Sequence, residues 1–316
     1  MTKAFQDHHQ ERKIVMTTLH IGMIGLGKMG MNLVQNMRDR GIAVTAYDLN
    51  TAARTQVAAY GATAVDSLAA LVQALTPPRI VWLMVPAGTP TEQSIETLTG
   101  LLSPDDILID GGNSFYKDSR RRAAALSAQG IHFFDAGTSG GMAGARRDGN
   151  FMIGGEEDVF PRIAALFQAI AAPDGYLFTG PAGSGHYLKM VHNGIEYGMM
   201  QAIGEGFEVL AKSEYDYDNA AVAKMWNHGS VIRGWLMGLA ENAFTADPNL
   251  TAIKGVMHSS GEGAWTVEEA IRLHVPTPAI SAALMARYRS EAPDAMSGKV
   301  VAALRNQFGG HAVDHQ

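Results

Sequence analysis

The segment of residues 19–48 restricts the possible folds of this chain more than any other. An apolar run, residues 19–24, leads into the turn Gly25-Leu26-Gly27-Lys28-Met29-Gly30. A helical pattern follows in residues 31–40, and a second apolar run, residues 43–47, ends at Asp48. This order of strand, glycine turn, helix, strand and acid is typical of a βαβ unit that binds a dinucleotide.

The three glycines of this turn have different expected roles. Gly25 makes the tight turn, Gly27 lets the pyrophosphate approach the backbone, and Gly30 lets the helix pack against the strand. The first N–H groups of the helix add donors and a positive dipole for the phosphates. The expected cofactor contacts in this turn are therefore Gly25, Leu26, Gly27, Lys28, Met29 and Gly30. A turn needed only for packing, and a methyltransferase of related fold, are the alternatives.

Asp48 bears on the choice between NAD and NADP. Its carboxylate can accept hydrogen bonds from both ribose hydroxyls of NAD, whereas the 2′-phosphate of NADP would lie beside a like charge. At ~4 Å and an effective dielectric constant of about 20, each such pair costs on the order of 4 kcal/mol. The next three residues supply no cation, and Arg54 is the first candidate. The sequence therefore predicts NAD as the cofactor, with NADP bound more weakly.

Apolar runs alternate with helical patterns as far as about residue 182, which predicts a parallel sheet with helices on its faces. We expect strands in residues 79–88 and 106–114, a strand with a glycine-rich loop in residues 132–150, and two last strands in NFMIGGE and GYLFTG. Ligands of such sheets bind at the carboxyl ends of the strands. The residues expected to border the cofactor there are Val85, Pro86, Ala87 and Asn113, and the Asn113 amide can also reach the substrate.

The glycine-rich loop is suited to binding a carboxylate. Ser139, Gly140 and Gly141 offer a hydroxyl and adjacent backbone N–H groups. A plain flexible loop without a ligand is the alternative.

Beyond Gly183 the strand patterns stop, and the remaining segments have helical periodicity. The fold class predicted is an α/β Rossmann domain followed by an all-α domain. We assign residues 1–17 to a disordered extension, 18–182 to the dinucleotide-binding domain, and 183–316 to a helical domain for substrate binding and oligomerisation.

A polar stripe marks the first helix of the second domain. Lys189, His192, Asn193, Glu196 and Met200 recur at helical spacing, so they share one face. Burying an amine, an imidazole, an amide and a carboxyl costs several kcal/mol unless they have partners. We interpret the stripe as a catalytic face with a lysine base and a glutamic acid, and a solvent-facing stripe is the alternative.

Composition excludes several classes of function. The net charge of −6 argues against a nucleic-acid partner. The chain has no cysteine, which excludes thiolate metal sites and fits a reducing cytoplasm. No apolar run is long enough to span a membrane, and no histidine or carboxylate cluster indicates a metal site.

Four motifs resemble those of 6-phosphogluconate dehydrogenase, a family of the β-hydroxyacid dehydrogenase superfamily. They are GLGKMGMNL from Gly25, DGGNS from Asp110, TSGG from Thr138 and HYLKMVHNGIEYGMMQ from His186. The last is the most specific, because relatives acting on hydroxyisobutyrate or tartronate semialdehyde lack His192, Glu196 and Tyr197. The resemblance extends over nearly all residues from Ile21 to His311.

The resemblance implies roles for individual residues. Lys189 would be the base and Glu196 the acid, with Asn193 beside them. The sugar acid would contact Asn113, Ser139, Gly140, Gly141, His192 and Asn193. The phosphate would contact Tyr197, Arg287, Arg305 and His311, the last two reaching across from a neighbouring subunit of a homo-oligomer, either a dimer or a tetramer.

Three departures from the long members of the family are informative. The chain ends soon after His311, as in the short NAD-linked branch. Asp48-Leu49-Asn50 stands where the long NADP-linked forms have Asn-Arg-Thr, which agrees with the charge argument. Ser260 stands in place of a phosphate-binding lysine, and a lost charged hydrogen bond is worth ~1.5–3 kcal/mol.

These residues imply an oxidative decarboxylation of 6-phosphogluconate to ribulose 5-phosphate and CO2, part of the pentose phosphate pathway. Lys189 would take the hydroxyl proton at C3, and Glu196 would protonate C1 after CO2 has left. One alternative is an NAD-dependent dehydrogenase or reductase of an unphosphorylated β-hydroxy acid, of the 3-hydroxyisobutyrate or tartronate semialdehyde type. A non-catalytic NAD-sensing protein is the other.

Overall fold

The computed structural model describes residues 19–292 and 294–314, and the extension predicted for residues 1–17 lies outside them. The chain divides into two compact units, Met1–His192 and Asn193–Gln316. The domain boundary predicted at residue 182 lies just before helix α9 (Ser184–Ala211), whereas the division between the units falls inside that helix. The predicted domain limits therefore stay a prediction.

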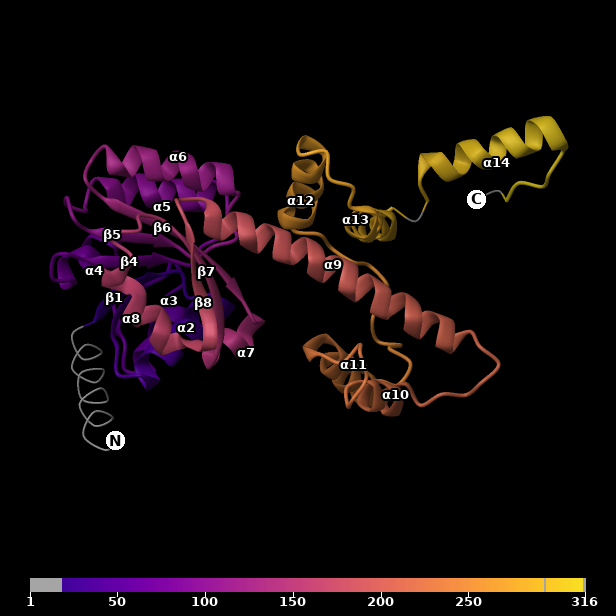
Figure 1. Cartoon of the computed structure of the whole chain (residues 1–316), viewed down its shortest axis with the longest axis horizontal. Coiled ribbons are helices and arrows are strands. Elements are labelled where there is room, and N and C mark those ends of the chain that lie inside the picture. Colours follow the sequence, from indigo (N-terminus) through magenta and orange to yellow (C-terminus); the bar gives the residue numbers. More distant parts are fainter. Residues whose placement is uncertain (1–18, 293, 315–316) are drawn as a thin grey trace. The chain divides into compact units, whose positions relative to one another are not determined.

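The first unit is built on an eight-stranded sheet with the order β3-β2-β1-β4-β5-β6-β7-β8 (Figure 1). The strands are β1 (His20–Ile24), β2 (Ala43–Tyr47), β3 (Thr63–Ala64), β4 (Ile80–Leu83), β5 (Ile107–Asp110), β6 (His132–Ser139), β7 (Gly149–Gly154) and β8 (Ala171–Gly180). β1 to β6 are parallel, β7 is antiparallel to β6, and β8 is parallel to β7. The strand order reverses between β1 and β4, which is where doubly wound sheets bind their ligands.

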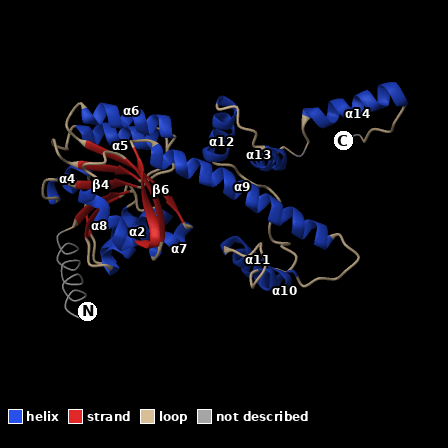
Figure 2. Ribbon diagram, viewed as in Figure 1, coloured by secondary structure: helices blue, strands red, loops and turns tan. Residues whose placement is uncertain are grey.

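Helices cover both faces of this sheet (Figure 2). They are α2 (Lys28–Asp39), α3 (Thr51–Ala59), α4 (Leu68–Ala74), α5 (Thr89–Thr99), α6 (Tyr116–Ser127), α7 (Gly141–Arg146) and α8 (Pro161–Ile170). Successive strand residues enter opposite cores: Ile107 and Ile109 pack on the side of α2 and α8, and Leu108 packs on the side of α4, α5 and α6. Burial on both faces explains why these strands are continuous apolar runs in the sequence.

The structure corrects three of the expected elements. The strands predicted for residues 79–88 and 106–114 end at Leu83 and Asp110. Pro86 has no N–H for a strand ladder, and the glycines after Asp110 favour a turn over a strand. The loop predicted after Ser139 contains the short helix α7. The residues that follow Leu83, Asp110 and Ser139 therefore lie in connections at the carboxyl edge of the sheet.

The described part of the second unit contains helices and no strand (Figure 2). After the remainder of α9 come α10 (Asn219–Trp226), α11 (Trp235–Ala246), α12 (Gly261–Arg272), α13 (Pro278–Glu291) and α14 (Met296–Gly309). Its two buried clusters are small, one around Phe207 and Phe244 and one around Tyr197 and Leu284. The Rossmann domain followed by an all-helical region is confirmed, and α14 falls within the residues predicted as helical.

α9 shows two different uses of glycine. A Cβ on Gly194 would lie 2.7 Å from Thr266 Cγ2, so this glycine lets α9 approach α12 closely. A Cβ on Gly204 or Gly206 would have no described atom within 4 Å. Although α9 has 28 residues, neither it nor any other helix in the described ranges is long and apolar enough to cross a membrane.

Candidate active site

The glycine turn joins β1 to α2 at the carboxyl edge of the sheet. Gly25 has a φ of 93°, and a Cβ on it would collide with the backbone oxygen of Met84. A Cβ on Gly30 would collide with the backbone oxygen of Gly25, so α2 packs directly on the turn. Gly27 is exposed with open space beside it, and no side chain caps the first N–H groups of α2. The start of α2 therefore has the space and the donors that a pyrophosphate requires.

Asp48 lies directly after β2 and holds the same turn. Its carboxylate accepts hydrogen bonds from the backbone N–H groups of Leu26 at 2.6 Å and Asn50 at 2.7 Å. The neighbouring Leu49 is 87% exposed. The half-buried carboxylate thus lies beside the pyrophosphate turn, where an acid of this fold binds ribose hydroxyls.

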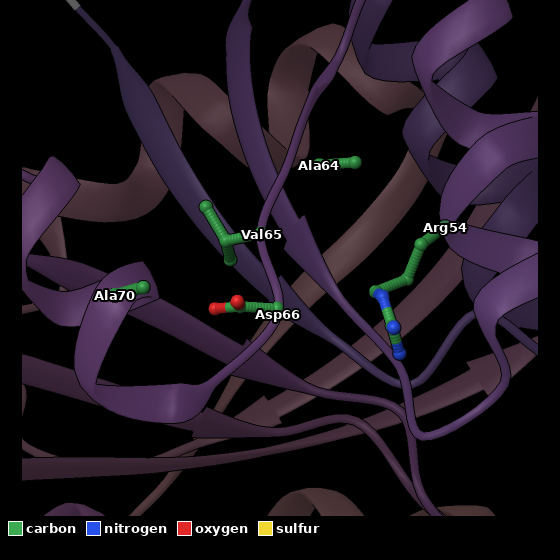
Figure 3. Close-up of a pocket in the computed structure, with 5 residues that line it drawn as sticks. All are labelled: Arg54, Ala64, Val65, Asp66 and Ala70. Carbon is green, nitrogen blue, oxygen red and sulfur yellow. The ribbon is translucent and has the colours of Figure 1, made fainter.

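Arg54, the first cation after β2, is engaged with the backbone. Its guanidinium donates to the carbonyl oxygens of Asp48 at 2.7 Å and Leu49 at 3.2 Å, and to Thr51 Oγ1 at 2.9 Å. It also borders a pocket of about 400 Å³ beside the carboxyl end of β3. The residues that line this pocket are Arg54, Ala64, Val65, Asp66 and Ala70 (Figure 3).

Asn113 is exposed in the loop that follows β5. The loop is held by Asp110, the buried last residue of β5. The Asp110 carboxylate accepts hydrogen bonds from Ser114 Oγ at 2.8 Å, Arg122 Nη1 at 2.8 Å and the Gly112 N–H at 3.1 Å. The other predicted cofactor neighbours, in the equivalent connection after β4, are Val85, Pro86 and Ala87.

Arg122 links this loop to α5. Its side chain is only 1% exposed, and its Nη2 also donates to Glu92 Oε1 at 2.7 Å. Burial opposes the ionisation of Glu92, but hydrogen bonds and charges from Arg121 and Arg122 outweigh burial and lower its pKa. Neither Asp110 nor Arg122 was assigned a role from the sequence, in which Asp110 only begins the motif DGGNS. Asp110 could have been recognised from the sequence as a carboxylate at the end of an apolar strand.

Lys189 is buried in the first turns of α9, where it packs on β6. Only 6% of Lys189 is exposed, and a Cβ on Gly137 of β6 would collide with its Cβ. Lys189 Nζ lies 3.5 Å from His192 Nδ1, and His192 Nε2 lies 3.1 Å from Ser139 Oγ. An amine, an imidazole and a hydroxyl of predicted site residues therefore lie together at the carboxyl end of β6.

The backbone beside Ser139 takes an unusual conformation. Gly140 and Gly141 have φ values of 97° and 58°, which glycine adopts without strain. Gly140 precedes the first turn of α7, and no side chain caps that turn. Backbone N–H groups consequently lie next to the Ser139 hydroxyl, an arrangement suited to carboxylate oxygens.

A second cluster lies in the Asn193–Gln316 unit. The ring of buried Tyr197 faces the guanidinium of Arg287, with Arg287 Cζ 3.7 Å from the ring centroid. Tyr197 Oη lies 3.2 Å from Ser260 Oγ and accepts a hydrogen bond from the Ser260 N–H at 3.1 Å. Ser260 precedes α12 and makes no side-chain cap to it. Two hydroxyls and a guanidinium are donors that suit a phosphate.

The remaining predicted residues of this unit lie in two places. Asn193 is buried and Glu196 is half-buried, both on α9. Arg305 of α14 and His311 after it are exposed. No described hydrogen bond, ion pair or ring contact joins Arg305 or His311 to the cluster around Tyr197.

The side chains brought together thus form one group in each unit. The Lys189 group can exchange a proton with a ligand, and the Tyr197 group can hold an anion. Across residues 19–292 and 294–314, no set of three or more His, Cys, Asp or Glu side chains is arranged to bind a metal ion.

Profiles of two known protein families together match residues 20–307 of the chain. The profile of the NAD binding domain of 6-phosphogluconate dehydrogenase matches residues 20–185. The profile of the 6-phosphogluconate dehydrogenase C-terminal domain matches residues 185–307. The first match contains the glycine turn and Asp48, and the second contains both Lys189 and the Tyr197 cluster.

Two curated relatives align over nearly their full length. YqeC of Bacillus subtilis, provisionally named a 6-phosphogluconate dehydrogenase, is 54% identical, with 94% of this chain and 99% of that protein covered. The NAD(+)-dependent, decarboxylating 6-phosphogluconate dehydrogenase of Haloferax volcanii is 44% identical, with coverages of 93% and 98%. The chain spans only 62% of the NADP(+)-dependent enzyme of Bacillus subtilis, to which it is 38% identical.

Solved structures of the same fold include a 6-phosphogluconate dehydrogenase. The 6-phosphogluconate dehydrogenase of Plasmodium falciparum superposes with a TM-score of 0.80 at 30% identity, covering 93% of this chain and 66% of that one. The 3-hydroxyisobutyrate dehydrogenase of Salmonella typhimurium has a TM-score of 0.72 at 22% identity, with coverages of 87% and 95%, and shares the fold. The chain belongs to the 6-phosphogluconate dehydrogenase family of oxidoreductases, and residues 20–185 are its NAD-binding domain.

Proposed function

We propose that this protein converts 6-phospho-D-gluconate to D-ribulose 5-phosphate and CO2 with reduction of NAD, a step of the pentose phosphate pathway. The observation that supports it most is the placement of buried Lys189 beside His192 and Ser139. A dehydrogenase must remove the hydroxyl proton as hydride leaves, and burial favours the neutral amine that can take it. The relatives that are 54% and 44% identical carry names with the same substrate.

The reaction can be assigned to residues of this chain step by step. Lys189 takes the proton of the C3 hydroxyl. Bound NAD supplies the acceptor for the hydride from C3. The resulting β-keto acid loses CO2 while protonated Lys189 polarises its carbonyl oxygen. Transfer of that proton from Lys189 to the oxygen gives the enediol. Glu196 then donates a proton to C1 of the enediol while Lys189 takes the hydroxyl proton back, and ribulose 5-phosphate results.

The other predicted residues hold the substrate in this scheme. Ser139, Gly140 and Gly141 bind the carboxylate, and His192 lies beside them to bind a hydroxyl. The amides of Asn113 and Asn193 bind further hydroxyls. Tyr197, Ser260 and Arg287 bind the phosphate, and the Ser260 hydroxyl replaces the lysine of other family members with a neutral donor.

The cofactor turn supports a preference for NAD over NADP. Asp48 places a carboxylate where the 2′-phosphate of NADP would lie, and Arg54 is already bonded to the backbone carbonyls of Asp48 and Leu49. In this proposal the pocket bordered by Arg54 and Asp66, beside the carboxyl end of β3, takes the adenosine end of the cofactor (Figure 3).

The double substitution Asp48→Asn with Leu49→Arg is expected to reverse this preference. It removes the like charge and adds a cation at a position that is 87% exposed and therefore tolerant of change. A charged hydrogen bond of about 1.5–3 kcal/mol predicts a change of roughly 10- to 150-fold in the ratio of kcat/KM for NAD to that for NADP. The steady-state rates with both cofactors measure it, with Leu49→Met as the neutral control. Equal use of the two cofactors by the wild type would contradict the assignment.

An assay of NADH formation and CO2 release tests the reaction itself. The expected result is equimolar NADH and CO2 from 6-phosphogluconate, and little activity on gluconate, 3-hydroxyisobutyrate or tartronate semialdehyde with NADH. Turnover of an unphosphorylated β-hydroxy acid without CO2 would favour the alternative dehydrogenase. Binding of NAD without turnover of any of these acids would favour a sensor.

We also propose that the protein is a cytoplasmic homo-oligomer whose sites are completed across subunits. α14 has no buried residue, and its Phe308 is 77% exposed. A helix whose apolar residues are left exposed by the described part of its own chain gains stability by packing on a second copy. Arg305 and His311 would thereby reach the phosphate of the partner's substrate.

A further inference from the structure

Asp135 is a buried carboxylate in β6 that the reaction scheme does not use. It is fully buried, and its strand neighbours in the sheet are Asp110 of β5 and Gly154 of β7. Its two carboxylate oxygens accept hydrogen bonds from the backbone N–H groups of Gly183 at 2.5 Å and His186 at 2.7 Å. Asp135 therefore caps the start of α9 from a different part of the chain.

The contact between Asp135 and the start of α9 leaves no room for a side chain at three neighbouring glycines. A Cβ on Gly154 would lie 2.8 Å from Asp135 Oδ1 and 2.8 Å from the Gly185 nitrogen. A Cβ on Gly185 would collide with the Met152 carbonyl oxygen, and one on Gly137 would collide with Lys189 Cβ. The first turn of α9 thus lies on bare backbone of β6 and β7.

His186 adds a second attachment on the other side of the helix start. Its Nδ1 lies 2.7 Å from Ser119 Oγ of α6 and 4.0 Å from Asp135 Oδ2. Ser119 and His186 are both buried. The first turn of α9 is consequently tied to β6 through a carboxylate and to α6 through an imidazole.

We propose that Asp135 is a positioning residue that fixes where the Lys189 amine lies relative to Ser139. Lys189 follows His186 by one turn, so the direction of its side chain is set by the same turn whose N–H groups Asp135 accepts. The charge of Asp135 also suits the positive end of the α9 dipole. The effect of Asp135 on turnover rests on the proposed function, whereas its effect on α9 and on Lys189 exposure does not.

The variant that tests the proposal is Asp135→Asn, which keeps the shape of the side chain. Its amide oxygen can still accept one N–H, but its NH2 group faces the other, so one buried donor loses its partner. Asp106→Asn is the matched control. Asp106 is equally buried and accepts hydrogen bonds from the backbone N–H groups of Arg79 and Ser103, and it also pairs with the Arg79 guanidinium at 2.9 Å. It precedes β5, at the opposite end of the strand from Lys189, so its loss should disturb the fold at least as much without reaching the site.

Two of the three measurements need no turnover. Hydrogen exchange is expected to be at least about tenfold faster in Asp135→Asn at one of the two amides, Gly183 or His186, because the donor that faces the new NH2 group loses its acceptor. Acetylation of Lys189, measured relative to exposed Lys254 in the same chain, is expected to rise at least severalfold over the slow rate of the buried wild-type amine. The third is kinetic: kcat is expected to fall by about 10- to 100-fold while the KM for NAD stays within about twofold.

The outcomes separate positioning from general stability. The proposal is overturned if folded Asp135→Asn shows wild-type hydrogen exchange and wild-type acetylation of Lys189. It is also overturned if Asp106→Asn raises the acetylation of Lys189 as much as Asp135→Asn does. If wild-type protein does not turn over 6-phosphogluconate, the proposed function fails, and the exchange and acetylation results still decide the role of Asp135.

Discussion

Replacement of Lys189 by methionine is expected to abolish the oxidation of 6-phosphogluconate while leaving the Kd for NAD within a few fold of the wild type. Methionine has nearly the length and flexibility of lysine, so it fills the same buried space against Gly137. It cannot accept the hydroxyl proton. Loss of general base catalysis typically lowers kcat by about 10²- to 10⁴-fold.

One further variant, Lys189→Arg, tests whether the loss of activity reflects the loss of a base. Lys189→Arg places a permanent positive charge beside His192, so it should be as inactive as Lys189→Met if proton removal is the task. Tryptophan fluorescence or calorimetry with NAD, performed on both variants, measures cofactor binding without turnover. Wild-type-like kcat in Lys189→Met would exclude this residue as the base.

The glycine turn shows why the nucleotide-binding half could be predicted in detail. The roles of Gly25 and Gly30 depend on close backbone contacts around one βαβ unit, so the local sequence is enough to predict them. The run that forms β2 was assigned to residues 43–47, which are the residues of that strand. Both strands are buried on two faces, and the resulting apolar runs are the strongest signal that a sequence offers.

The polar stripe on α9 is predictable for a similar reason. Helical spacing fixes which side chains share a face, and this is enough to place Lys189 one turn from His192. The spacing does not reveal which residues pack against this face of α9. Ser139 meets His192 across more than fifty positions of sequence, and its selection depended on its glycine-rich surroundings and on the family resemblance.

Asp135 and Arg122 escaped prediction because their partners are distant in sequence. An aspartate within an apolar strand has the same local pattern whether it binds a ligand, a cation or the N–H groups of another helix. Asp135 bonds to Gly183 and His186, and Arg122 bonds to Asp110 and Glu92. Only the tertiary structure shows that these charges hold α9 and the Asn113 loop.

α14 lies in the region predicted as helical, but its packing could not be predicted, for a different physical reason. Its apolar residues, among them Val300, Leu304 and Phe308, are exposed within the single chain. A helix is normally recognised by the core that one face enters, and here that core is not supplied by the residues described. This favours a partner chain as the missing half of the packing, and it suggests a direct experiment.

Mixing two inactive variants is expected to restore activity if the tail of one subunit completes the site of another. Arg305→Ala should lose one charged hydrogen bond to the phosphate, about 1.5–3 kcal/mol, or roughly 10- to 150-fold in kcat/KM for 6-phosphogluconate. Lys189→Met lacks the base. Unfolding the two variants together and refolding them gives mixed oligomers in which one chain supplies Lys189 and the other Arg305.

The size of the recovery follows from the arithmetic of random pairing. In a dimer, half of the sites contain an intact Lys189, and half of those face a partner with an intact Arg305. About a quarter of the sites should therefore regain wild-type kcat/KM, since the two-fold symmetry of a dimer pairs each site with one partner tail. Arg305→Ala refolded alone and Lys189→Met refolded alone provide the baselines.

Gluconate serves as a second control, because a substrate without phosphate does not need Arg305. Any slow oxidation of gluconate should be the same in Arg305→Ala as in the wild type, and mixing should change it only by dilution. If native mass spectrometry confirms mixed oligomers and activity on 6-phosphogluconate does not rise above the baselines, then Arg305 does not act across subunits. The exposed apolar face of α14 would in that case serve assembly alone.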